Sequence, residues 1–144
     1  MNKLLFVILL MPGLTHAGDS ASDSPEARLI TELRADAAKC SIDGQLAALE
    51  VPANASAKRI QQAGEVGLKC EAEMREKVKP LYRSTLEQAP DSRPQLTAMY
   101  AKWLNYLQAL GNPFAQDEHR RAGEAFEAAI ADLGAELDAR PTSP

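Results

Sequence analysis

The chain has 144 residues, of which 16 are Lys or Arg and 20 are Asp or Glu, giving a net charge of −4. An acidic chain without a basic cluster is poorly matched to polyanions, so we expect neither nucleic acid nor an anionic membrane as a partner. Beyond residue 17 there are two cysteines and one histidine, and no C-x-x-C motif, so we expect no metal, haem or other cofactor.

Residues 1–17, MNKLLFVILLMPGLTHA, have the pattern of a secretory signal peptide. A basic Lys3 precedes an apolar run, and Ala17 ends a stretch suited to cleavage, so that Gly18 would begin the mature chain. The apolar run is much shorter than the ~20 residues that span a bilayer. The sequence therefore predicts a bacterial periplasmic or secreted protein with no membrane insertion after cleavage.

The remaining chain, about 127 residues, is enough for one domain with its own core. Residues 18–23 and 140–144 are rich in small, polar and proline residues, and we expect both to be flexible. The domain itself is predicted to span residues 24–139.

The first predicted helix begins with Ser24 as its cap and Pro25 in its first turn, and ends before Pro52. Its residues repeat at steps of three and four along one seam: Ile30, Leu33, Ala37, Cys40, Gly44 and Ala47. A second apolar stripe lies on another face and consists of Ile42, Leu46 and Leu49. Either the helix kinks near Gly44 or it has two neighbours there, and we favour two neighbours.

Three further helices are predicted, over residues 54 or 56 to about 87, 95–110 and 116–139. Pro80 falls inside the first of these and should kink it, because proline removes a backbone donor. Gly111, Asn112 and Pro113 end the second. Four amphipathic helices with short connections predict an all-α, antiparallel up-down-up-down four-helix bundle.

Cys40 and Cys70 are predicted to form a disulfide between the first two helices. In an antiparallel pair of helices, each residue adds ~1.5 Å along the helix axis. The positions of the two cysteines along this axis then differ by only ~5 Å. Small residues next to both cysteines, including Gly44 and Gly67, allow the helices to approach closely.

The helix over residues 95–110 has an apolar arc wider than one core face requires. Either it lies deep in the bundle or part of it forms a partner surface. Tyrosine and tryptophan are common anchors of protein interfaces. The possible interaction surface consists of Met99, Tyr100, Trp103, Tyr106 and Phe114.

No catalytic residue is predicted. His119 falls at the edge of a core-facing stripe and has no nucleophile signature to serve. Glu71 lies within the apolar arc of its helix, but Arg75 follows at the spacing of a helix ion pair, which indicates a position at the core boundary.

These patterns favour a non-catalytic protein-interaction module, such as an inhibitor, an immunity-type protein, or a chaperone or adaptor. In size, expected compartment and helix content, the chain resembles small disulfide-bearing helical immunity proteins of secreted toxins. The partner would be another protein or a second copy. The alternative is a ligand-binding protein or helical enzyme for a small anionic metabolite, bound by Arg34, Arg59, Glu71 and Arg75.

Overall fold

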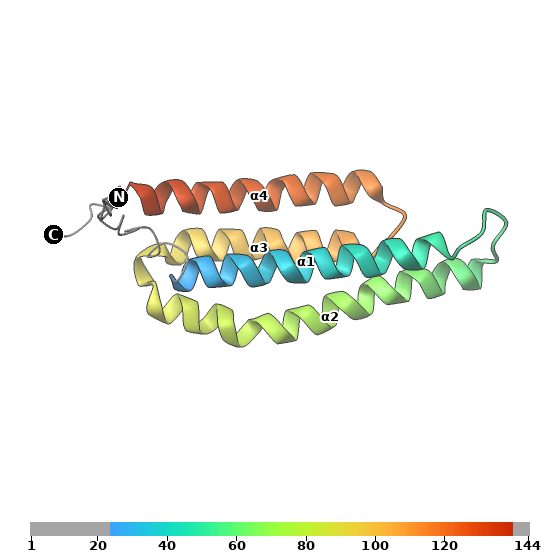
Figure 1. Ribbon diagram of the computed structural model, residues 1–144, viewed down its shortest axis with the longest axis horizontal. Helices are drawn as coiled ribbons and strands as arrows, with labels where there is room; N and C mark the ends of the chain where they lie inside the picture. The colour runs from blue at the N-terminus through green and yellow to red at the C-terminus, as the bar shows by residue number, and fades with distance from the viewer. Residues whose placement is uncertain (1–23, 140–144) are drawn as a thin grey trace, which may run out of the picture.

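The computed structural model describes residues 24–139, which fold into an antiparallel bundle of four α-helices (Figure 1). The predicted signal peptide, residues 1–17, and the predicted flexible ends, 18–23 and 140–144, lie outside the described residues. The helices are α1 (Pro25–Leu49), α2 (Ala57–Gln88), α3 (Arg93–Leu110) and α4 (Gln116–Asp138), with a short 3-10 helix η1 (Pro90–Ser92) before α3. The predicted all-α four-helix bundle is confirmed. None of these helices has an apolar stretch long enough to cross a membrane.

Local chemistry explains where α1 and α2 begin. Ser24 caps α1, and its hydroxyl accepts a hydrogen bond from the amide of Ala27 at 3.1 Å. Ser56 is the cap residue of α2. The helix α2 continues through Pro80 to Gln88 and is bowed rather than straight (Figure 1).

The core is centred on α3. Helix α1 packs along α2, α3 packs along α4, and α3 also contacts both α1 and α2. Five side chains of α3 are almost completely buried: Leu96, Met99, Trp103, Leu107 and Leu110. The indole of Trp103 donates a hydrogen bond to the carbonyl of Leu33 in α1 at 2.9 Å, which satisfies its polar atom inside the core. Of the two alternatives for this helix, the structure shows the one in which it lies deep in the bundle.

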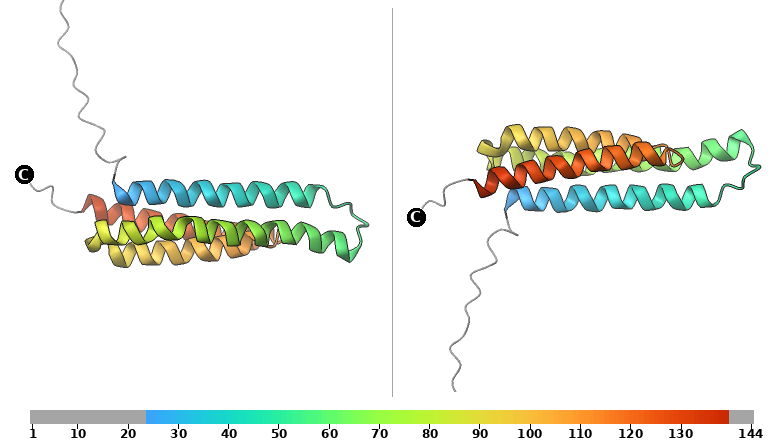
Figure 2. Two further views of the ribbon diagram at one scale, coloured as in Figure 1. Left: turned by 90° about the horizontal axis from the view of Figure 1, so that it is seen from below. Right: turned by 90° about the horizontal axis from the view of Figure 1, so that it is seen from above.

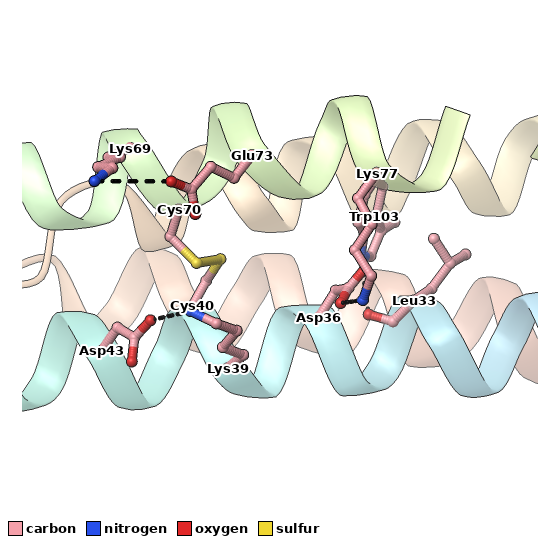
Figure 3. Close-up of a disulfide and its surroundings, with 10 residues drawn as sticks. All are labelled: Leu33, Asp36, Lys39, Cys40, Asp43, Lys69, Cys70, Glu73, Lys77 and Trp103. Carbon is pink, nitrogen blue, oxygen red and sulfur yellow. Dashed lines mark hydrogen bonds and ion pairs between the residues drawn. A yellow bond between two sulfur atoms is a disulfide. The ribbon is translucent and has the colours of Figure 1, made fainter. Parts of the chain in front are cut away.

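The predicted disulfide between Cys40 and Cys70 is present and joins α1 to α2, with a Cα–Cα distance of 5.6 Å (Figure 3). On α1, the Lys39 ammonium forms an ion pair with Asp43, and on α2 Lys69 pairs with Glu73. Both pairs are exposed and contribute little to stability. Each of these ion pairs lies within one helix. The disulfide is therefore the main link between α1 and α2 in this part of the hairpin.

Two carboxylates of α1 are buried, one in the middle of the helix and one in its first turn. Asp36 of α1 accepts a hydrogen bond from the Lys77 ammonium at 2.7 Å, while its second oxygen is buried without a hydrogen-bond partner. Glu26 accepts a hydrogen bond from the Ser92 hydroxyl at 2.8 Å. Because a buried charge is costly without a partner, these contacts fix α1 against α2 and η1.

Candidate functional site

The α1–α2 hairpin extends beyond the ends of α3 and α4 (Figure 1), and both views in Figure 2 show the same overhang. We call residues 42–68 the hairpin tip. Gly67 lies where α3 ends, and a Cβ atom there would be 2.8 Å from the Leu110 carbonyl oxygen and 2.9 Å from the Gly111 Cα. Only glycine fits such a close approach without a shift of the backbone. Gly64 is one turn nearer the α1–α2 connection. A Cβ atom on Gly64 would have nothing within 4 Å, so α3 no longer covers α2 there.

The second apolar stripe of α1 lies on the outside of this tip. The exposed fractions are 56% for Ile42, 57% for Leu46 and 81% for Leu49. The expectation that a second neighbour covers this stripe is wrong within the described residues, and α1 continues as one helix through Gly44 to Leu49. The stripe therefore belongs to the surface, and its spacing of four and then three residues is that of a helix-pairing seam.

More exposed apolar side chains lie at the same end of the molecule. Ile60, Val66 and Leu68 of α2 are exposed, and so is Phe114 in the α3–α4 connection beside the tip. Within residues 24–139, every large apolar side chain that is exposed lies on the tip or is Phe114. A patch confined to one end is typical of an interaction site rather than of scattered surface residues.

A shallow hollow joins the stripe to the α3–α4 connection. Its volume is about 420 Å³, and Ala48, Leu49, Pro113 and Phe114 contribute its apolar lining. Asp43 and Lys39 pair with each other beside the stripe, and the hydrogen bond that the Lys39 ammonium donates to Asp43 raises the pKa of Lys39. The apolar part of this lining is thus suited to contact an apolar side chain.

The five residues of the interaction surface predicted from the sequence differ in how far they are buried. Met99 and Trp103 are fully buried and cannot contact a partner in this conformation. Tyr100 and Tyr106 are half-buried, and burial raises the pKa of both phenols. Of the five residues, Phe114 alone lies beside the tip and is exposed.

The four residues of the predicted anion site do not converge. Arg34 forms an ion pair with Glu127 of α4, whereas Arg59 lies on the tip, on α2. Glu71 and Arg75 pair with each other along α2 at 3.4 Å, as their spacing predicted. No hollow found among the described residues is lined by two of these arginines.

His119 lies at the start of α4 and is half-buried. Its Nε2 atom is 2.7 Å from the carbonyl oxygen of Asn112, which gives the ring a fixed polar contact. This placement agrees with a boundary histidine. Across residues 24–139, no group of three or more His, Cys, Asp or Glu side chains is arranged to hold a metal ion.

Sequence reasoning missed one cluster. Arg75, Lys79 and Arg83 follow each other at four-residue steps along α2, and they line a hollow together with Tyr82 and Tyr100. The repeated spacing of basic residues was visible in the sequence, but the position of Tyr100 against Tyr82 depends on how α3 packs on α2.

Comparisons with models of protein families, with curated proteins and with solved structures found no match to this chain.

Proposed function

We propose that this protein is a non-catalytic interaction module that binds an amphipathic helix of another protein through its hairpin tip. The observation that carries the proposal is the concentration of exposed apolar side chains at this one end. Burial of such side chains on binding would supply a favourable free energy of roughly 25 cal/mol per Å² of apolar surface.

The spacing of Ile42, Leu46 and Leu49 favours a helix as the binding element. Side chains separated by four and three residues form one row on a helix, and a second helix with the same row can pack against it. The row is about 10 Å long, at ~1.5 Å per residue. A stable protein interface typically uses about 20–30 residues from each side, so a partner would also have to contact the tip beyond this row.

We also propose that the protein works in the periplasm or outside the cell. The Cys40–Cys70 bond supports this, since disulfides persist mainly in oxidising compartments. The sequence pattern of residues 1–17 points the same way. After expression of the full chain, we expect the protein in the periplasmic or external fraction. Its mass should match that of a chain that begins at Gly18. A cytoplasmic product with free thiols would contradict this part of the proposal.

The binding proposal is tested with a matched pair of variants. The oxidised protein, the double variant Leu46→Gln and Leu49→Gln, and the control Ala128→Gln and Ala131→Gln are used as baits in periplasmic extract. All four positions are exposed, so the variants should fold alike. We expect the wild type and the control to recover the same protein, and the tip variant to recover at least about tenfold less.

Two results would contradict the binding proposal. Equal recovery by the tip variant would show that binding does not involve the stripe. Light scattering that shows a dimer in the wild type, and a monomer in the tip variant, would assign the stripe to self-association instead.

A further inference from the structure

A second surface feature lies between α2 and α3, beyond the hairpin tip in the direction of η1. The guanidinium groups of Arg75 and Arg83, the Lys79 ammonium and the Tyr82 and Tyr100 rings line a hollow of about 430 Å³. We call it the basic groove; Glu76 and Leu104 complete its lining. Successive cations along α2 are separated by about 6 Å of helix rise.

The positive charge of the basic groove is only partly neutralised. The Arg75 Nε atom is 3.4 Å from Glu71, and the Lys79 Nζ atom is 2.7 Å from Glu76, whose side chain is 73% exposed. Arg83 forms no ion pair with any residue of the described range 24–139. Exposed pairs of this kind contribute little, so an anion can replace Glu76 as the partner of Lys79 at small cost.

An aromatic stack leads from the core into the same groove. The Trp103 and Tyr100 rings are 5.4 Å apart, and the Tyr100 and Tyr82 rings are 3.9 Å apart and nearly parallel. Tyr100 thus has a ring on each side, whereas Tyr82 has a ring partner on one side within the described residues. The Tyr82 hydroxyl lies 3.3 Å from Thr97, which holds the ring in place. Tyr82 and Tyr100 both line the hollow, so a ring bound there would meet an aromatic surface.

From this combination we propose that the basic groove binds a small aromatic carboxylate. The ring of the ligand packs against Tyr82 and Tyr100, and its carboxylate lies between Lys79 and Arg83. A volume of about 430 Å³ is within the range of small-molecule sites, roughly 300–1,000 Å³. The basic groove requires a ligand with both an aromatic ring and a negative charge. This requirement distinguishes it from the hairpin tip, which lacks surplus positive charge.

The proposal is tested by calorimetric titration of the oxidised protein with 2-naphthoate. Two analogues each lack one required feature: cyclohexanecarboxylate lacks the aromatic ring and 2-naphthalenemethanol lacks the charge. We expect both analogues to bind at least about tenfold more weakly than 2-naphthoate. We expect Arg83→Gln, Lys79→Gln and Tyr82→Leu each to weaken 2-naphthoate binding by about three- to tenfold.

Arg121→Gln on α4 and Leu46→Gln on the tip are the controls, and both should bind 2-naphthoate as the wild type does. The proposal is overturned by an absence of binding at millimolar 2-naphthoate, by equal binding of cyclohexanecarboxylate, or by loss of binding in Leu46→Gln. Because the two sites use different residues, equal protein capture by the wild type and the tip variant, with intact 2-naphthoate binding, would overturn the proposed function alone.

Discussion

The two ends of the α1–α2 hairpin differ in what covers them. At the end near η1, α3 packs against both helices, and Leu33, Val78 and Trp103 are fully buried. At the hairpin tip the same two helices are covered only where Gly44 and Gly67 meet the end of α3, and Leu46 and Leu49 are exposed. The cause is a mismatch in length, since α1 and α2 have 25 and 32 residues while α3 and α4 have 18 and 23. An apolar stripe is thus core or surface according to whether another helix reaches it.

The largest expected difference between the ends is in stability. Trp103→Ala should lower the free energy of unfolding by about 3–5 kcal/mol, because it leaves a cavity and removes the bond to Leu33. Leu46→Ala should change the same quantity by less than about 0.5 kcal/mol. Urea unfolding followed by circular dichroism measures both. Similar losses in the two variants would contradict the comparison.

The disulfide marks the boundary between the two regions. Replacing both Cys40 and Cys70 by serine should cost about 3–4 kcal/mol, because the closed loop spans 30 residues. The wild type under reducing conditions is the control and should lose the same amount. Unchanged urea midpoints would show that helix packing alone holds α1 and α2 together.

Two glycines one turn apart on α2 test where α3 stops packing against α2. Gly67→Ala should destabilise by about 1–3 kcal/mol, because its Cβ would meet the Leu110 carbonyl at 2.8 Å. Gly64→Ala should stabilise by about 0.5–1 kcal/mol, because the position is open and alanine favours a helix. Thermal unfolding of both variants gives the signs. Effects of the same sign would contradict the placement of α3.

The smallest effect concerns the exposed ion pair between α1 and α4. Hydrogen bonding from Arg34 lowers the pKa of Glu127 below its ordinary value of 4.5. Folding thus favours the ionised carboxyl, and this contribution is present above about pH 4.5 and is lost as the pH falls through the lowered value. Glu127→Gln should cost less than about 1 kcal/mol at pH 7, and in urea titrations this cost should shrink as the pH falls through the lowered pKa of Glu127. A cost that grows as the pH falls would contradict the sign.

Much of the fold could be predicted because its signals are local. Ser24 and Pro25 at the start of α1, and Gly111 at the end of α3, have defined backbone roles that require no knowledge of distant residues. The disulfide could be predicted because chain rise and a short connection place Cys40 beside Cys70.

The candidate sites were harder to predict because they depend on packing between helices. The stripe of Ile42, Leu46 and Leu49 was visible, but a sequence pattern does not report whether a neighbour covers it. Trp103 is of a residue type common to cores and interfaces, so composition alone could not place it.

A photo-crosslinking amino acid at position 46 tests most directly whether the hairpin tip binds a helix of another protein. The same amino acid at position 128, on the exposed face of α4, is the control. We expect position 46 to crosslink in cells to one other protein, at a peptide with apolar residues at helical spacing, and position 128 to give no such product. Crosslinks confined to a second copy of this chain, or equal products from both positions, would contradict the proposed function.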